Sequence, residues 1–403
     1  MKRIVVIGAG PAGMATALEA ARSGNEVIVL DKNSITGRKL RITGAGRGNL
    51  TNLNVTPNKY FSHHDAGFVQ SVIGKMDSTA MVDYLRALGI FTWHTDDGWV
   101  YPVSNSAVNV AALFEVRLIE AGVKLKLGTP VQDILWTPDS IRVITTQGEE
   151  LQCSRLIIAC GGKAYPELGS TGELLTVMKR LGHKVWPIKP ALAPVVTDMK
   201  SIHKLQGVRL DAVVSLWRKN EMIAETEGNI IFTHWGINGP GVMDVSHWVN
   251  EYLQDTLFLQ IDFLGKYTKD FFVFLKNQRN ANLGIGSLFG SVLPPKMVTF
   301  LLEQSGIPAG TQISQISDEK LDGLLSLARH LRIDIKGLKG FDQCQVSAGG
   351  ISLAEVDPLT MHSKRLPGIY FAGEMLDVIG PCGGYNLHWA LATGILAGRG
   401  VTL

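Results

Sequence analysis

Three glycines and one acid near the start of the chain have the spacing of a nucleotide-phosphate site. Gly8, Gly10 and Gly13 form a GxGxxG motif, and Asp31 follows about 20 residues later. The first glycine allows a tight turn, the second lets a pyrophosphate approach the backbone, and the third lets a helix pack on a sheet. The phosphates then meet the positive end of the helix dipole. Because an aspartate at this distance suits the ribose hydroxyls, the motif predicts a dinucleotide site rather than an empty turn.

A glycine-rich basic segment at 36–52 follows this motif. Its sequence, TGRKLRITGAGRGNLTN, interleaves cations with glycines and ends in polar residues that include Asn49. Backbone N–H groups and guanidinium groups together can hold an anion in such a loop. We expect that anion to be the cofactor pyrophosphate, because the loop follows the strand that ends at Asp31; the alternative is a solvated basic loop. The cations are Arg38, Lys39, Arg41 and Arg47.

Further candidates for chemistry lie in the middle of the chain. Cys160 ends a hydrophobic strand and precedes Gly161, which suits a backbone that passes close to a ligand; a buried apolar cysteine is the more ordinary interpretation. The segment 169–172, GSTG, opens a helix and is a second candidate site for an anion or substrate. His234 lies in a glycine-punctuated turn at 232–241, either as a proton donor or as a hydrogen-bonded turn residue.

A second strand–glycine–helix pattern lies near the C-terminal end of the sequence. Residues 368–374 predict a strand that ends in the Gly373–Glu374 pair, and a glycine turn at 380–386 leads into a helix at 387–397. This pattern would return the end of the chain to the first domain. Residues 347–351 are interpreted as a glycine turn. The glycines at 284–286 are interpreted as a loop between helices, because no β-branched strand precedes them.

Short β-branched strands and helices alternate along the first part of the chain and position these residues. After a proline-rich stretch near residue 190 the pattern changes to strands and then to helices. Strands are predicted at 2–7, 27–30, 123–127, 131–136, 141–146, 151–152, 155–160, 212–217, 230–233 and 256–261, with a hairpin at 91–101. Helices are predicted at 14–22, 77–88, 109–121, 173–181, 269–279, 292–305 and 318–330.

The bulk composition limits the class of protein. A chain of 403 residues with 45% hydrophobic residues predicts two or three globular domains. We expect neither a secretory signal nor a membrane span, because the N-terminus enters a strand at once and no apolar run is long enough. The four cysteines lack zinc or CxxC spacing, which favours reduced thiols in the cytoplasm and no metal site. A net charge of +3 is compatible with an anionic partner without requiring one.

Taken in order, the motifs resemble a known family. The blocks are the GxGxxG motif with its acid, the basic loop, GGKAYPELGSTG, FTHWGINGPGV, SAGGI and YFAGEMLDVIGPCGGYN. They are similar to blocks of the bacterial two-dinucleotide-binding-fold flavoproteins, in the branch named for dehydro-bile-acid reductase and ribosomal RNA dihydrouridine synthase. The resemblance implies an α/β fold with a discontinuous Rossmann-like FAD domain, a β-barrel-like insert and a small helical subdomain. It places these parts at 1–190 plus 340–403, 191–267 and 268–339.

The resemblance also implies the site residues. The Gly373–Glu374 pair would hold the ribityl and phosphate region, and Val131 the adenine side. The dipole of the last helix would stabilise the reduced flavin. Gly48 stands where family members often have a cysteine, so a thiol there cannot act in this chain, and Cys382 remains as a candidate. The FAD-binding residues implied are Gly8, Gly10, Gly13, Asp31, Lys32, Arg38, Lys39, Arg47, Asn49, Val131, Gly161, Gly373, Glu374, Gly384, Tyr385 and Asn386.

The first functional hypothesis is an FAD-dependent oxidoreductase that passes hydride from NAD(P)H to an activated C=C bond. An acid would protonate the neighbouring carbon, and the candidate acids are Cys382, His234 and Tyr385. We expect no separate nicotinamide-binding fold, so NAD(P)H would be a transient donor. Two other classes remain open: a flavin electron-transfer protein without its own substrate, and an oxidase that uses oxygen.

The first hypothesis leaves two classes of substrate open. Uridine in ribosomal RNA is favoured by mild basicity and by cations outside the flavin loop, although these can equally be ordinary surface charge. A small enone such as a steroid or bile acid is the alternative. The cations in question are Lys200, Lys204, Arg209, Arg218, Lys219, Lys336 and Lys339.

Overall fold

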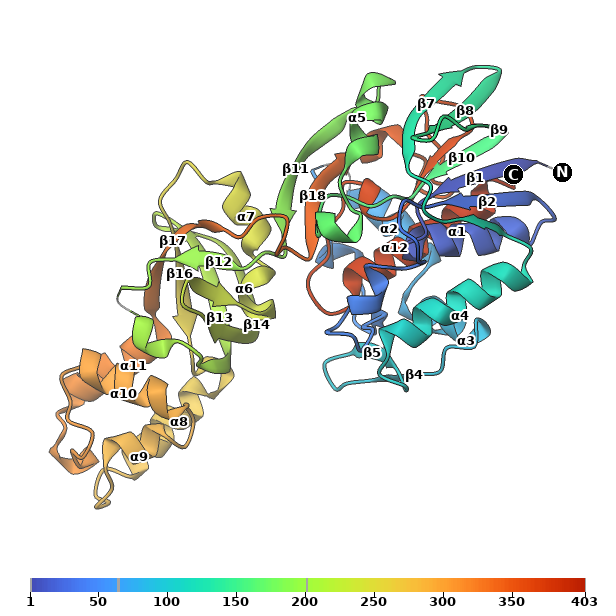
Figure 1. Ribbon diagram of the computed structural model, residues 1–403. Coiled ribbons are helices and arrows are strands. Elements are labelled where there is room, and N and C mark those ends of the chain that lie inside the picture. The colour runs from blue at the N-terminus through green and yellow to red at the C-terminus, as the bar shows by residue number, and fades with distance from the viewer. Residues whose placement is uncertain (1, 64–65, 201, 403) are drawn as a thin grey trace. The chain divides into compact units, whose positions relative to one another are not determined.

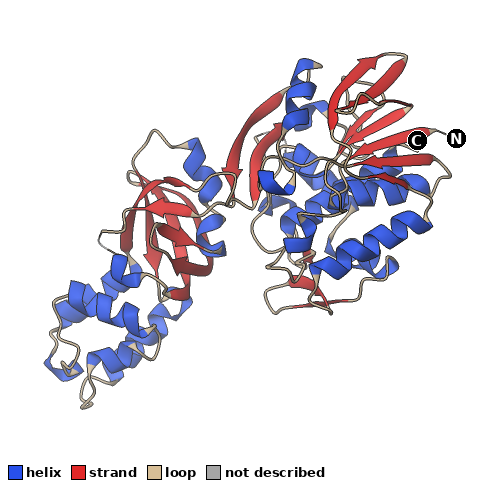
Figure 2. Cartoon of the chain, in the orientation of Figure 1, coloured by secondary structure: helices blue, strands red, loops and turns tan. Residues whose placement is uncertain are grey.

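The computed structural model describes residues 2–63, 66–200 and 202–402 (Figure 1). Its contacts divide the chain into two compact units. The first comprises residues 1–190 and 344–403, and the second comprises residues 191–343. Each unit contains both helices and strands (Figure 2).

The first unit is built around a five-stranded parallel sheet. The strand order is β19 (Ile369–Phe371), β10 (Arg155–Ile158), β1 (Arg3–Ile7), β2 (Glu26–Leu30) and β6 (Lys124–Lys126). All four pairings are parallel. The four strands β1, β2, β10 and β19 are rich in β-branched and other apolar residues, because nearly every position in them is buried.

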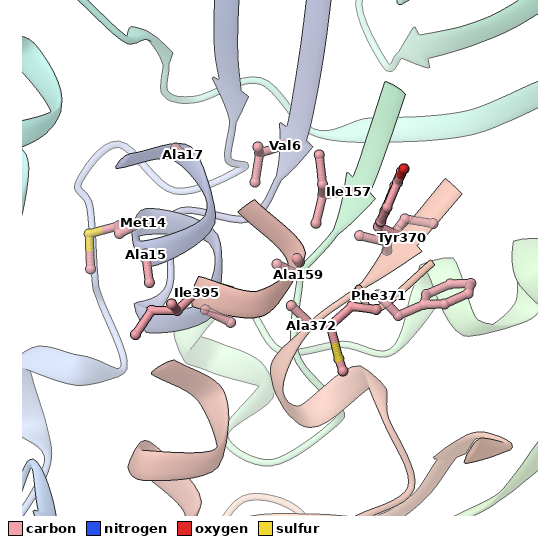
Figure 3. Close-up of a cluster of buried hydrophobic side chains, with 14 of the residues drawn as sticks. Val6, Met14, Ala15, Ala17, Ile157, Ala159, Tyr370, Phe371, Ala372 and Ile395 are labelled. Atoms are coloured by element: carbon pink, nitrogen blue, oxygen red, sulfur yellow. The ribbon is translucent and has the colours of Figure 1, made fainter. Parts of the chain in front are cut away.

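Two helices from opposite ends of the chain pack together on this sheet. Helix α1 (Pro11–Ala21) contacts helix α12 (Tyr385–Gly400), and the Thr16 hydroxyl donates to the Gly394 carbonyl at 3.0 Å. A Cβ at Gly394 would overlap the Ala12 carbonyl, so glycine is required for this close approach. Figure 3 shows the resulting core, with Val6, Met14, Ala15, Ile157, Phe371 and Ile395 among the buried side chains.

Smaller sheets and helices complete the first unit. Strands β3 (Thr51–Asn52), β5 (Trp99–Pro102) and β4 (Thr92–His94) form one sheet, and β7 (Val131–Thr137), β8 (Ser140–Thr145) and β9 (Glu150–Cys153) form another. Strand β11 (Val185–Ala191) pairs with β18 (Val346–Ile351). The remaining helices are α2 (Ala66–Lys75), α3 (Ser78–Ala87), α4 (Ala107–Glu120) and α5 (Glu173–Arg180), with short 3₁₀ turns that include η1 (Leu40–Ile42) and η8 (Gly373–Met375).

The second unit is a closed barrel with helices. The barrel order is β12 (Val195–Thr197), β15 (Gly236–Asn238), β14 (Glu221–Phe232), β13 (Arg209–Arg218), β16 (Leu257–Asp262) and β17 (Leu331–Leu338). The helices of this unit are α6 (Pro240–Met243), α7 (Ser246–Glu251), α8 (Thr268–Asn277), α9 (Ile285–Phe289), α10 (Pro295–Gln304) and α11 (Asp318–Arg329). The structure confirms the predicted α/β class with a Rossmann-like sheet, an inserted barrel and a small helical part.

Several local predictions were wrong for identifiable reasons. The short strands predicted between 123 and 152 were expected to form one small meander, but 123–127 joins the edge of the parallel sheet as β6, and only β7, β8 and β9 form a separate sheet. Helix α2 was not predicted, although its buried residues Phe68, Val69, Val72 and Ile73 recur at helical spacing. The predicted turn at 347–351 is strand β18. Its Gly349 lies so close to β11 that a Cβ would overlap the Pro187 carbonyl, so the glycine marks a close strand approach. The predicted loop at 284–286 opens helix α9.

Candidate cofactor site

A cavity opens at the carboxyl edge of the parallel sheet. Gly8 and Gly10 after β1, Asp31 and Lys32 after β2, and Gly161 after β10 line it. In open α/β sheets this edge is where nucleotides bind, because the strand ends and helix N-termini converge there. Among the predicted site residues, the cavity brings together Gly8, Gly10, Asp31, Lys32, Arg38, Lys39, Val131, Gly161, Gly373 and Glu374.

The three glycines of the GxGxxG motif have distinct environments. Gly8 has φ of +109°, and a Cβ there would overlap the Ala159 carbonyl oxygen. A Cβ at Gly13 would overlap the Gly8 carbonyl oxygen, so this glycine serves the packing of α1 and does not line the cavity. Gly10 has an ordinary φ of −77°, lines the cavity and has no atom within 4 Å of a Cβ position. The empty space beside Gly10 at the start of α1 therefore suits a pyrophosphate.

Asp31 is fixed at the end of β2 by backbone donors. One carboxylate oxygen accepts from the Ala9 N–H at 2.6 Å, and the other accepts from the backbone and amide N–H groups of Asn33 at 2.7 and 3.0 Å. An ionised carboxylate accepts about four hydrogen bonds, so acceptor capacity remains for a ribose hydroxyl. Arg38 donates to the Asn33 side-chain oxygen at 2.9 Å, which joins the basic loop to this corner of the cavity.

A charged network closes the other side of the cavity. Lys39 Nζ lies 2.9 Å from one oxygen of Glu374, and the second oxygen accepts from the Ser347 N–H and hydroxyl at 2.8 and 2.9 Å. The Ser347 hydroxyl in turn accepts from the Lys163 N–H at 3.0 Å. These contacts join the basic loop, β18 and the segments that follow β10 and β19. Glu374 thus positions Lys39 beside the cavity.

We expect Glu374→Gln to weaken FAD binding about tenfold and to lower stability by about 1–3 kcal/mol. The amide has one accepting oxygen where the carboxylate has two, so either the partly buried Lys39 ammonium group or the Ser347 N–H loses its acceptor. Fluorescence titration of the apoprotein with FAD, together with urea unfolding, measures both effects. Glu303→Gln is the matched control, because Glu303 pairs with Lys204 at 2.6 Å on an exposed surface where ion pairs contribute little. Equal affinities in the two variants would contradict this role.

Arg47 and Asn49 lie outside the lining of this cavity and support the basic loop. The Arg47 guanidinium lies 4.6 Å from the centre of the Tyr101 ring and donates to the Tyr101 hydroxyl at 3.1 Å. With its amide oriented so that both ends have partners, Asn49 donates to the Thr51 carbonyl and accepts from the Gly384 N–H, each at 3.1 Å. These contacts hold the loop against β5 and the start of α12.

The first turn of α12 is packed by hydrogen bonds and glycine contacts. A Cβ at Gly384 would overlap the Thr51 carbonyl oxygen. The Tyr385 hydroxyl donates to the Asn54 carbonyl at 3.2 Å, and the Asn386 amide bonds both the N–H and the carbonyl of Gly380 at 2.8 and 2.7 Å. Gly384, Tyr385 and Asn386 therefore lie outside the lining of this cavity and fix the direction of the helix.

The candidate acids belong to both units, Cys382 and Tyr385 to the first and His234 to the second. Cys382 is 9% exposed, with its sulfur 3.8 Å from the Gln345 side-chain oxygen, and Tyr385 is 6% exposed. His234 is exposed in the second unit, on the turn between β14 and β15. Cys160 lines the cavity, but burial raises the pKa of its thiol to about 12, so it stays protonated and apolar.

Sequence reasoning missed Ser347, Asn33 and the lining segment 129–130. The GSTG segment, predicted as a second candidate site for an anion or substrate, contributes Gly169, Ser170 and Thr171 to the lining of this same cavity. The Asn33 contact follows from its place two residues after Asp31, a spacing typical of Asx turns. Ser347 carried no local signal, because its partner Glu374 is 27 residues away.

Within the described residues, no group of three or more His, Cys, Asp or Glu side chains could hold a metal ion. Among the same residues, no helix is long and apolar enough to cross a membrane.

The residues present fit FAD. A helix N-terminus with free space beside Gly10 suits the pyrophosphate, Asp31 suits the ribose, and Lys39 and Arg38 supply positive charge near the phosphates. The backbone after β10 and the Gly373–Glu374 pair line the same cavity.

Comparison with known proteins supports this assignment. A family model described as "HI0933-like protein Rossmann domain" matches residues 2–400. The 3-dehydro-bile acid delta(4,6)-reductase of Clostridium scindens is 33% identical over 408 residues, covering 99% of this chain and 98% of that protein. The ribosomal RNA dihydrouridine synthase of Haemophilus influenzae is 29% identical over 392 residues, covering 96% and 95% of the two chains.

A solved structure shares the fold. The 3-ketosteroid-delta4-(5alpha)-dehydrogenase of Rhodococcus jostii RHA1, in complex with 4-androstene-3,17-dione, has a TM-score of 0.56 to this chain. The alignment covers 100% of this chain and 97% of that one at 15% sequence identity. At this identity the similarity concerns the arrangement of the backbone.

Proposed function

Because the chain belongs to the HI0933-like Rossmann-domain family, as its motifs predicted, we propose that it is an FAD-dependent oxidoreductase. Its reaction is the reduction of a C=C bond conjugated to a carbonyl, with hydride from NAD(P)H. The single observation that carries the proposal is the cavity at the sheet edge, built from the GxGxxG turn, Asp31, the basic loop and Glu374. When bound, FAD supplies a two-electron carrier between the nicotinamide and the substrate carbon.

Different residues of the chain bind different parts of FAD. Gly10 and the start of α1 receive the pyrophosphate, and Asp31 orients the ribose of the adenosine half. Lys39, held by Glu374, balances phosphate charge, and α12 directs the positive end of its dipole toward the region beyond Gly384. We propose that the nicotinamide donor binds transiently; the glycines at 284–286, which resemble a glycine motif, open the short helix α9.

A small enone of the steroid or bile acid class is the substrate we favour. The chain aligns over nearly its whole length with the bile acid reductase, at higher identity than with the dihydrouridine synthase. Residues 191–343 contain about as many acidic as basic side chains. Two of the cations that could form an RNA face are paired there, Lys204 with Glu303 and Arg218 with Glu221. Such a surface lacks the surplus charge on which polyanion binding depends.

Uridine in ribosomal RNA is the second candidate. It is favoured by the two dihydrouridine synthases, each 29% identical over 96% of this chain, and by the net charge of +3. The two substrates share one chemistry, because the uracil C5=C6 bond is conjugated to a carbonyl in the same way as an enone.

The test uses FAD-loaded protein without oxygen, given NADH or NADPH and one acceptor at a time. The acceptors are a 3-oxo-4,6-diene steroid and a ribosomal RNA fragment. We expect nicotinamide oxidation beyond one equivalent per FAD only with an acceptor present, and a steroid product two hydrogens heavier by mass spectrometry. Dihydrouridine in the RNA with unchanged steroid would transfer the assignment to the second candidate. Turnover that requires oxygen, or none with either acceptor, would overturn the reductase proposal.

A further inference from the structure

A second cavity of the first unit lies at the amino edge of the parallel sheet, opposite the edge that carries the cofactor site. This amino-edge cavity has a volume of about 720 Å³, a size typical of pockets for small organic ligands. Arg3 begins β1, Arg155 begins β10, and Gly368 immediately precedes β19, and all three line the cavity. The turn between β7 and β8 at 138–139 and the side chain of His362 also line it. It shares no lining residue with the cofactor cavity.

The lining of the amino-edge cavity has more basic than acidic side chains. Arg3 and Arg155 supply two guanidinium groups, and the carboxylate in the described lining is that of the exposed Asp139. Outside the lining, Glu26 is shared between Arg3 at 2.9 Å and Lys124 at 2.7 Å. One carboxylate balances only one of these two cations, so positive charge remains at this edge of the sheet. An anion is therefore the kind of ligand that the cavity favours.

Two side chains of the lining have donors that can serve an anion. Arg155 Nη1 donates to the Ser154 carbonyl at 2.9 Å, whereas its buried Nε has no partner among the described residues. The guanidinium group is thus only partly satisfied, and a nearby oxyanion would compensate its charge. The Gly368 N–H donates to His362 Nε2 at 3.0 Å, so Nε2 is unprotonated. The neutral imidazole then carries its proton on Nδ1 and can donate to an anion.

We propose that the amino-edge cavity is a second ligand site, for a small organic molecule that carries a phosphate group. Guanidinium groups form strong charge-assisted hydrogen bonds with phosphate oxygens. A phosphate group has three terminal acceptor oxygens, and the donors here come from three segments, at Arg3, Arg155 and His362. Pro138 and Pro367 add apolar surface to the lining, which the organic part of the ligand would contact.

The ligand of this site takes no part in hydride transfer. Arg3 lines the amino-edge cavity, and Gly8, five residues further along β1, lines the cofactor cavity. Five residues of a strand span about 17 Å. Reacting atoms must approach to about 3–3.5 Å, so a molecule bound at the amino edge is not a hydride donor or acceptor. The inference therefore does not rest on the proposed function.

The test uses protein loaded with FAD, so that the cofactor cavity is filled. Isothermal titration calorimetry measures the binding of AMP, adenosine and inorganic phosphate. We expect AMP to bind, and adenosine, which lacks the phosphate, to bind about tenfold more weakly or less. Arg155→Gln should weaken AMP binding about tenfold. Arg142→Gln removes the same charge and is the matched control, because Arg142 pairs with Glu150 at 3.0 Å and lies outside the lining.

A second variant covers the case in which Arg155→Gln does not unfold cooperatively in urea. The Arg3 side chain is 51% exposed, so Arg3→Gln should fold normally and weaken AMP binding about fivefold. Absence of AMP binding to the wild type, or binding to both variants as tight as to Arg142→Gln, would overturn the proposal. Equal affinities for inorganic phosphate and AMP, both dependent on Arg155, would overturn the organic ligand in favour of the free ion. Since these titrations involve no turnover, their failure leaves the proposed function untouched.

Discussion

Gly10→Val should remove FAD binding while the protein still folds. Gly10 has φ of −77° and ψ of 179°, which any residue adopts, and no atom lies within 4 Å of its Cβ position. The valine side chain therefore meets only the space that we assign to the pyrophosphate. Loss of about two charge-assisted hydrogen bonds would weaken FAD binding roughly a thousandfold, or about 4 kcal/mol.

Two other glycines make this prediction specific. Gly74→Val in α2 also meets open space at an ordinary φ, so it should bind FAD as the wild type does. Gly13→Val should instead destabilise the fold, because its side chain would overlap the Gly8 carbonyl. Urea unfolding of the apoproteins and FAD titration of each variant separate the three cases. A Gly10→Val protein that binds FAD with wild-type affinity would place the cofactor elsewhere.

The contrast among these glycines shows how far sequence reasoning reaches. The GxGxxG motif and Asp31 are local patterns, and the structure places Gly8, Gly10 and Asp31 around one cavity as the strand–turn–helix order implies. The motif also distinguishes Gly10, expected beside the pyrophosphate, from Gly13, expected to let the helix pack closely. In the structure Gly10 lines the cavity, whereas Gly13 packs against the Gly8 carbonyl and does not line it.

Contacts between distant segments were the least predictable part of the first unit. The Glu374–Ser347 and Asp377–His63 contacts join residues 27 and 314 positions apart. Neither serine nor histidine stood in a motif with its partner. Residues 347–351 were predicted as a glycine turn, but they belong to strand β18, whose N–H groups at Ser347 and Gly349 donate to the carboxylates of Glu374 and Asp377. A glycine in such a stretch can mark either a turn or a close approach of two strands. Here it marks a close approach, because β11 packs against Gly349.

A buried histidine in α12 should make the protein unstable in mild acid. His388 is fully buried, and its Nε2 lies 2.8 Å from the Met76 carbonyl while Nδ1 lies 2.7 Å from the Thr51 hydroxyl. A carbonyl can only accept, so Nε2 carries the proton and Nδ1 accepts from Thr51. Burial lowers the pKa of His388 from 6.5 to about 4, because the apolar surroundings disfavour the imidazolium.

The sign of the pH effect follows from this lowered pKa. Below about pH 6.5 the unfolded chain binds a proton at His388 that the folded chain does not bind. The free energy of unfolding therefore falls as the pH decreases from about 6.5 to about 4, by about 3 kcal/mol in total. Burial also lowers the pKa of His183, which adds to the loss in the same direction.

His388→Gln isolates the contribution of this one residue. The glutamine amide can donate toward the Met76 carbonyl, but it has no proton to gain, so this variant should be less stable at pH 7.5 and lose less stability on acidification. Urea unfolding of both proteins from pH 7.5 to pH 4.5 measures the difference, and carboxylates common to both cancel in the comparison. Parallel pH profiles would mean that His388 titrates normally. His388 joins β3 and Met76, the residue after α2, to helix α12, whose first turn follows Gly384. We therefore expect acid to release FAD over the same pH range.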